Sequence, residues 1–93
     1  MEVIATKHFL KQLKSVPPKV QNSVYEVLKK LREANDFQSS GVDYKPLEGQ
    51  KKGENYYRIR VGGWRIGIEY VEPKVIVITL MSRGDVYKHF PPK

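Results

Sequence analysis

The side chains of this sequence that could carry out chemistry are four arginines and two protonatable groups near the C-terminus. Arg58, Arg60 and Arg65 fall in two short runs of alternating polar and apolar residues, and Arg83 follows a third, apolar run. Arginine does not shed its charge by deprotonation, so a cluster of arginines either stays solvated or binds an anion. On these residues alone, the two interpretations are equally supported.

The chemistry that suits such a cluster is cleavage of a phosphodiester without a metal. RNA is cut when its own 2′-hydroxyl attacks the adjacent phosphate, and the four arginines could stabilise the charged transition state. Tyr87 or His89 could transfer the protons, because histidine titrates near neutrality and surrounding positive charge lowers the pKa of a tyrosine. Without further context, a half-buried aromatic at position 87 and an exposed tail histidine at position 89 are the favoured interpretations.

The sequence lacks the residues that several other classes of chemistry require. There is no glycine-rich phosphate loop of the Walker or dinucleotide type. His8 and His89 are the only histidines and have no paired acids at metal-ligand spacing, so neither a metal nor another cofactor is expected. The absence of cysteine agrees with a cytoplasmic location. No apolar run is long enough to span a bilayer, so no membrane association is expected.

The charge of the chain favours a polyanionic partner. Lysine and arginine total 17 against 10 acids, which gives a net charge of +7 over 93 residues. The basic residues concentrate between positions 51 and 65, where Glu54 is the only acid. Lys51 and Lys52 precede the arginine runs and could extend the same basic surface.

The arginine runs predict a β-hairpin. Gly62 and Gly63 separate the runs, and two glycines between alternating segments are typical of a two-residue hairpin turn. This turn places Arg60 opposite Arg65 on one face. The other face is apolar, and its expected members are Tyr57, Ile59, Val61, Trp64, Ile66 and Ile68.

The rest of the chain supplies elements to cover that apolar face. We expect an edge strand at 1–5, a helix from an N-cap at Thr6 to about residue 15, and a second helix after Pro17. A short edge strand at 42–47 and a central strand at 75–81 complete the pattern. The helices carry apolar stripes. The stripe residues are Phe9, Leu10, Leu13 and Val16 in the first helix and Val20, Val24, Val27, Leu28 and Leu31 in the second.

These elements predict one α+β domain over residues 1–93, with an N-terminal strand and an αα-hairpin packed on a three- to four-stranded antiparallel sheet. Trp64 and Ile66 are expected to be largely buried near Leu13, Leu28 and Leu31. The arginine face is expected to point outward. The last strand should leave the sheet beside the Gly62–Gly63 turn, so that the tail can fold across the arginines.

The order of these features resembles the RelE/ParE superfamily of bacterial toxins from type II toxin–antitoxin systems. The resemblance rests on the chain length, the helical hairpin, the segment 57–66 (YRIRVGGWRI) and the C-terminal segment 83–88 (RGDVYK). It implies a compact fold similar to microbial ribonucleases. In the RelE branch it also implies cleavage of messenger RNA in the ribosomal A site.

The resemblance also implies roles for residues. Arg58 and Arg60 match two outward basic positions on one strand, which are often lysine in that branch, and Arg65 matches an arginine on the next strand. Arg83 and Tyr87 are the closest matches to a C-terminal arginine and tyrosine, although Arg83 falls nearer the tyrosine than in the best-known members. The catalytic candidates are therefore Arg60, Arg65, Arg83, Tyr87 and His89, the last because some relatives use a C-terminal histidine. The RNA-binding candidates are Lys51, Lys52, Arg58 and Lys88.

Two alternatives stay open. The ParE branch shares the fold and poisons DNA gyrase without cutting RNA, and a non-catalytic basic module could grip RNA. The resemblance implies three partners, namely a cognate antitoxin, the ribosome and mRNA. The charge predicts that an acidic segment of the antitoxin, disordered alone, folds over the basic face.

Overall fold

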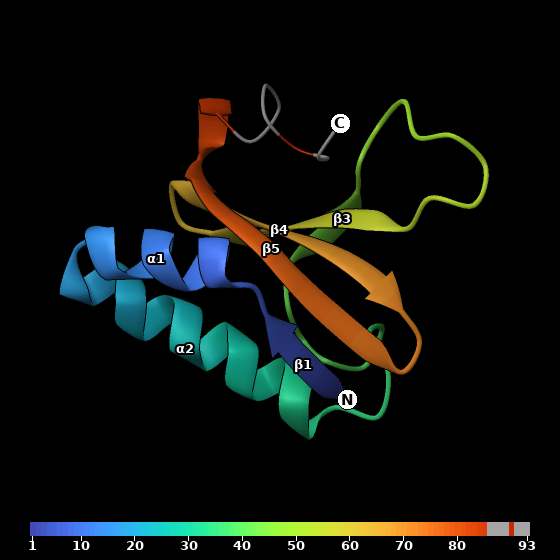
Figure 1. Ribbon diagram of the computed structural model, residues 1–93. Helices are drawn as coiled ribbons and strands as arrows, with labels where there is room; N and C mark the ends of the chain where they lie inside the picture. The colour runs from blue at the N-terminus through green and yellow to red at the C-terminus, as the bar shows by residue number, and fades with distance from the viewer. Residues whose placement is uncertain (86–89, 91–93) are drawn as a thin grey trace.

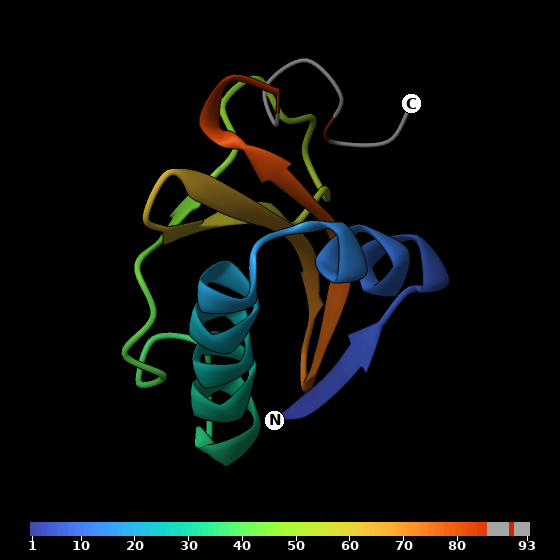
Figure 2. The same ribbon diagram turned by 90° about the vertical axis from the view of Figure 1, so that its left-hand side faces the viewer.

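The computed structural model describes residues 1–85 and residue 90. Two helices lie along one side of a five-stranded sheet, and the long loop before β3 lies on the other side (Figure 1, Figure 2). The elements are, in chain order, β1 (Glu2–Ala5), α1 (Lys7–Ser15), α2 (Pro18–Glu33), β2 (Tyr44–Pro46), β3 (Tyr56–Val61), β4 (Trp64–Val71) and β5 (Lys74–Ser82). The α+β class and the order of the elements are confirmed.

The sheet has the strand order β1-β5-β4-β3-β2. Strands β2 to β5 form the expected antiparallel meander, with β2 at one edge. The N-terminal strand β1 joins the same sheet as a fifth strand at the other edge, where it runs parallel to β5 from the pair Glu2–Lys74 to the pair Ala5–Val77. The two helices between β1 and the rest of the sheet provide the long connection that a parallel pairing requires.

The hairpin of β3 and β4 has the predicted register. Arg60 pairs with Arg65, and Val61 pairs with Trp64, on either side of the Gly62–Gly63 turn. Gly62 has a φ of 60°, which a residue with a side chain rarely adopts, so the first turn position requires glycine. The two faces of the hairpin are therefore fixed by this turn.

The helices begin where the sequence predicts. The Thr6 hydroxyl accepts a hydrogen bond from the Phe9 amide at 3.1 Å, and α2 starts at Pro18. Phe9 and Leu13 are buried, but Leu10 is 44% exposed, so its assignment to the core face was wrong. Leu10 directly follows Phe9, and a step of one residue turns a helical side chain toward another side of the helix. In the part of the chain that the structure describes, neither helix is long and apolar enough to cross a membrane.

The core lies between the helices and the inner face of the sheet, and Ile59, Ile66 and Ile68 are completely buried there. Trp64 packs against this core on the expected face and keeps part of its surface exposed. Trp64 is the first residue of β4, at the end of the sheet where α2 begins. The helices therefore cover it on one side only.

The buried hairpin face should respond to the loss of a single methylene-sized group. Replacing Ile66, which has no exposed surface, with valine should lower the free energy of unfolding by about 0.5–1.5 kcal/mol. The matched control is Ile4→Val on β1, where the isoleucine is 38% exposed and the change should stay within about 0.5 kcal/mol. Urea denaturation of both variants measures the difference, and equal losses would contradict the assignment of faces.

Helix α1 holds β5 at a bulge. The pairing of β4 with β5 shifts register between Gly67 and Ile68. Next to this shift, the Gln12 side-chain oxygen accepts hydrogen bonds from the Thr79 hydroxyl at 3.0 Å and the Leu80 amide at 2.8 Å. The helix thereby fixes the course of β5 toward its end at Ser82, immediately before Arg83.

Candidate functional site

Strands β2, β3 and β4 bring basic side chains to the outer face of the sheet. Lys45 on β2 pairs with Arg58 on β3, and Arg60 pairs with Arg65 on β4. Paired residues share a face of the sheet, so these four side chains all stand on the side away from the helices. Rigid strands rather than loops therefore position the charges.

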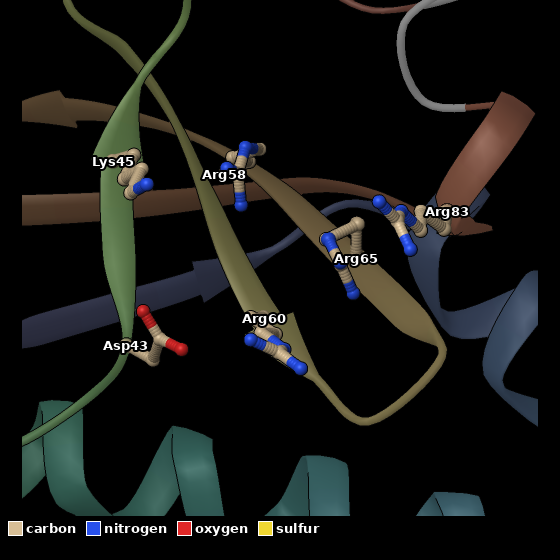
Figure 3. A pocket seen from close by; sticks show the side chains of 6 residues that line it. All are labelled: Asp43, Lys45, Arg58, Arg60, Arg65 and Arg83. Carbon is tan, nitrogen blue, oxygen red and sulfur yellow. The ribbon is translucent and has the colours of Figure 1, made fainter.

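These side chains surround a cavity of about 260 Å³ (Figure 3). Among the residues that the structure describes, its lining comprises Asp43, Lys45, Arg58, Arg60, Arg65 and Arg83. We call this cavity the cationic pocket. Five like charges around one small space repel each other, and a bound anion would relieve that repulsion.

Arg65 is the most firmly placed cation in the pocket. Only 6% of its surface is exposed, and one guanidinium nitrogen, Nη1, donates to the carbonyls of Gly62 and Trp64 at 2.8 Å each. Arg60, by contrast, is exposed, and Arg58 is partly buried. The pocket therefore has a fixed charge at its base and adjustable charges at its rim.

Arg83 reaches the pocket through the end of β5. The pair Trp64–Ser82 brings this end beside the hairpin turn, and the Arg83 amide donates to the Gly63 carbonyl at 3.0 Å. The expectation that β5 leaves the sheet beside the turn is confirmed. Four arginines thus converge from β3, β4 and the end of β5. Arg83 is 18 residues from Arg65, the nearest of the other three in sequence.

A second, smaller cluster lies on the same outer face. Phe90 is 5% exposed and packs with Leu47, and its ring meets that of Tyr56 edge-on at a centroid distance of 5.4 Å. A Cβ added to Gly67 would lie 3.0 Å from two atoms of the Phe90 ring. Because Gly67 is paired with Arg58, the glycine makes room for Phe90 beside the cationic pocket.

The comparisons with known proteins agree with this architecture. No family model matches the sequence. Toxin RelE3 of Methanocaldococcus jannaschii is 34% identical over 91 residues, covering 98% of this chain and 100% of the relative. The chain belongs to the RelE toxin family.

Solved structures support the same assignment. A chain of the RelB–RelE antitoxin–toxin complex from Methanococcus jannaschii is 31% identical with a TM-score of 0.76, over 95% of this chain and 99% of that one. A chain of the archaeal RelE–RelB complex from Pyrococcus horikoshii OT3 has a TM-score of 0.69 at 24% identity, over 89% and 94% of the two chains. The isolated E. coli RelE toxin, at 18% identity and a TM-score of 0.65 over 95% of this chain and 92% of that one, shares the fold. The 34% identical RelE3 and the 31% identical chain of the RelB–RelE complex place the chain in the RelE-like branch of the superfamily.

The structure of this RelE-family chain brings together some of the predicted site residues. Arg58, Arg60, Arg65 and Arg83 all line the cationic pocket. Tyr87, Lys88 and His89 lie outside the described residues, so their roles stay predictions. Phe90, which follows them, packs on the arginine side of the sheet.

The two loop lysines are not part of the pocket lining. Lys51 and Lys52 are exposed in the loop before β3, at the end of that strand opposite the hairpin turn. The Gln50 side chain braces this loop, since its amide nitrogen donates to the Leu47 and Tyr56 carbonyls at 2.9 Å each and its oxygen accepts from the Tyr56 amide at 2.7 Å. An RNA contact by these lysines would lie beyond the pocket, along the same strand.

Tyr56 is a described tyrosine on this side of the sheet, and it is poorly suited to act as a base. Burial raises the pKa of its hydroxyl, and the nearby charges of Glu69 and Glu54 raise it further. The hydroxyl therefore stays protonated at neutral pH. Its packing against Phe90 indicates a structural role instead.

Sequence reasoning missed two residues of the pocket. Asp43 and Lys45 line it, and the Asp43 carbonyl accepts a hydrogen bond from the Arg60 amide at 2.8 Å. A signal for Lys45 was present, because an edge strand at 42–47 that pairs with β3 places alternate residues beside the arginines. Asp43 is the only acid among the described residues of the pocket lining, and Figure 3 shows its carboxylate on the Arg60 side.

Phe90 should hold the end of the chain on the arginine face. Phe90→Ala removes a buried ring from the small outer cluster, which should cost about 3 kcal/mol of local stability. Because the main core does not include this ring, amide hydrogen exchange at Leu47 and Tyr56 should become faster while the main unfolding transition changes less. The control is Phe90→Leu, which keeps most of the apolar contact. Equal exchange rates at these positions in Phe90→Ala and the parent protein would contradict this packing role.

Proposed function

We propose that this chain is the toxin of a RelBE-type toxin–antitoxin system and that it cuts messenger RNA on the ribosome. The observation that carries the proposal is the cationic pocket, which gathers four arginines and a lysine around one cavity. Membership of the RelE family supports it. The proposed reaction is attack of an RNA 2′-hydroxyl on the adjacent phosphate, which releases the 5′ oxygen of the next nucleotide as a hydroxyl.

Each candidate site residue has a separate proposed role in this reaction. Arg65, fixed by the carbonyls of the hairpin turn, is suited to hold the phosphate that is attacked. Arg60 and Arg83 stand around it and neutralise the charge that grows on the phosphate oxygens. Tyr87 and His89 are the proposed proton-transfer groups, and Arg58, Lys45 and Lys88 are proposed to bind flanking phosphates. This chemistry assigns no step to a metal or another cofactor.

The proposed partners follow from the same pocket. A free toxin must be held inactive, and an acidic antitoxin segment that folds over the cationic pocket would neutralise it. The solved relatives from Methanococcus jannaschii and Pyrococcus horikoshii are themselves complexes of RelE with RelB. A cytoplasmic location agrees with ribosomes as the target.

Mapping of RNA ends in a purified translation system tests the proposal. An mRNA is translated with and without the protein, and the new ends are located by primer extension and tested for a 5′-hydroxyl. Cuts within translated codons that carry a 5′-hydroxyl and require ribosomes are expected. Uncut mRNA on ribosomes that retain the protein would favour a non-catalytic binding module. Uncut mRNA together with gyrase-dependent linear DNA would favour a gyrase poison.

The pocket should also give a measurable salt dependence. If Arg60 contacts a phosphate, Arg60→Gln should reduce the slope of log affinity against log salt by about 0.7 for single-stranded RNA. Lys29→Gln on the exposed side of α2 removes the same charge far from the pocket and serves as the control. Fluorescence anisotropy of a labelled RNA at several salt concentrations measures both slopes. If the two variants have the same slope, Arg60 is part of a solvated surface and makes no phosphate contact.

A further inference from the structure

A second cavity lies on the opposite, helix-facing side of the hairpin tip. It has a volume of about 290 Å³ and is lined by Lys19, Val20 and Ser23 of α2 and by residues 61–64 of the hairpin. Trp64 is the aromatic member of this lining and is only partly buried. The cavity therefore combines a flat aromatic side chain and aliphatic carbon with one lysine, and we call it the tryptophan pocket.

The two pockets are neighbours across one turn. Gly62 and Gly63 line the tryptophan pocket, and the same two residues accept hydrogen bonds from the groups that build the cationic pocket. The Gly62 carbonyl accepts from Arg65 Nη1 at 2.8 Å, and the Gly63 carbonyl accepts from the Arg83 amide at 3.0 Å. A bound polymer that crosses the turn from the cationic pocket therefore reaches the tryptophan pocket.

The turn is also unobstructed. Apart from the adjacent residues of the chain, no described residue has a heavy atom within 4 Å of the position that a Cβ would take on Gly62 or Gly63. The positive φ of Gly62 explains that glycine, but Gly63 has no positive φ and no close neighbour. Neither backbone conformation nor packing accounts for the missing side chain at position 63, and its absence leaves a low ridge between the pockets.

We infer that the tryptophan pocket binds one base of a single-stranded RNA whose phosphates occupy the cationic pocket. This inference rests on the proposed function and adds a base-binding subsite to it. Stacking of bases on aromatic side chains beside basic residues is the usual way in which proteins hold single strands, and it tolerates any base. Lys19 at the rim matches the charge of a nucleotide phosphate, which an acidic peptide would share, but the flat ring of Trp64 beside a phosphate site favours RNA.

The single tryptophan of the chain makes the test direct, because its fluorescence reports on this pocket alone. The intact protein is titrated with hexa-adenylate and, separately, with a polyphosphate of the same charge. Both ligands should bind through the cationic pocket, and hexa-adenylate alone should quench the fluorescence of Trp64. Bound hexa-adenylate without quenching would overturn the base subsite and leave the phosphate site in place. Failure of both ligands to bind would remove the phosphate site and the proposed function together.

Variants separate stacking from folding. Trp64→Leu keeps an apolar side chain and should weaken hexa-adenylate binding about ten-fold, as loss of one stacked base does, with polyphosphate affinity unchanged. Trp64→Phe keeps a ring and should retain most of the hexa-adenylate affinity. Equal affinity of Trp64→Leu and the parent protein for hexa-adenylate would overturn the inference and leave the pocket to a protein partner.

The ridge gives an independent variant. Gly63→Thr places a side chain where the fold has open space, so the thermal unfolding temperature should stay close to that of the parent protein. The side chain would stand between the pockets and should weaken hexa-adenylate several-fold more than polyphosphate. If Gly63→Thr is folded and binds both ligands as the parent protein does, RNA does not cross the turn and the inference fails.

Discussion

Arg65→Gln is expected to lower the rate of ribosome-dependent RNA cleavage by roughly 100- to 1,000-fold, the effect of removing one preorganised group that stabilises developing charge. Arg65 is the buried cation of the cationic pocket, and the carbonyls of Gly62 and Trp64 already fix its guanidinium. The charge therefore needs no rearrangement when the phosphate becomes more negative in the transition state. Single-turnover cleavage on programmed ribosomes measures the loss.

Arg65→Lys separates the two contributions of this side chain. Lysine keeps the charge but cannot reproduce the planar fork of the guanidinium, so cleavage should recover only in part. The fold is checked by thermal unfolding, because loss of hydrogen bonds to two turn carbonyls should cost about 1–3 kcal/mol of stability. A folded Arg65→Gln variant that cleaves as fast as the parent protein would show that Arg65 only braces the hairpin turn.

Tyr87→Phe is expected to abolish cleavage while ribosome affinity and stability stay at the level of the parent protein. The change removes a single oxygen, and general acid–base groups contribute about 100- to 10,000-fold to a rate. The described neighbours support this expectation, since Arg83 lines the cationic pocket and Phe90 packs over Gly67 on the same face of the sheet. Tyr87 lies between these two positions in sequence.

His89→Ala is the matched comparison for the tyrosine. If His89→Ala alone stops cleavage, the site is retained but the proton-transfer group has been assigned to the wrong residue. If neither substitution changes cleavage, the C-terminal segment supplies no proton transfer and the proposed mechanism fails. Ribosome co-sedimentation of each variant keeps a loss of binding apart from a loss of chemistry.

The lining of the cationic pocket also includes an acid, which affects the affinity of the pocket for phosphates. In the part of the chain that the structure describes, Asp43 is the only residue with a carboxylate that lines the cationic pocket, and its backbone carbonyl accepts a hydrogen bond from the Arg60 amide. An acid in this place reduces the net attraction for any phosphate chain. Among its described lining residues the pocket therefore has five cations and one acid, and the acid directly precedes β2.

The sequence by itself determined the hairpin and the two helices. A two-residue Gly62–Gly63 turn and the alternation of side chains leave one register, so Arg60 must face Arg65. The Thr6 cap and Pro18 at the start of α2 act within a few residues, which makes them readable without a partner. The chain length, the helical hairpin and the segments 57–66 and 83–88 also resemble the RelE/ParE superfamily strongly enough to indicate the family.

Only the tertiary structure decided how remote segments meet. Pairing of β1 with β5, burial of Arg65 and the seat of Phe90 on Gly67 all depend on contacts between residues far apart in sequence. Trp64 shows the limit of pattern reading, because alternation gives its face but not its distance from the end of the helices. Local patterns fix direction and register, whereas the depth of burial and the convergence of charges are set by which elements pack together.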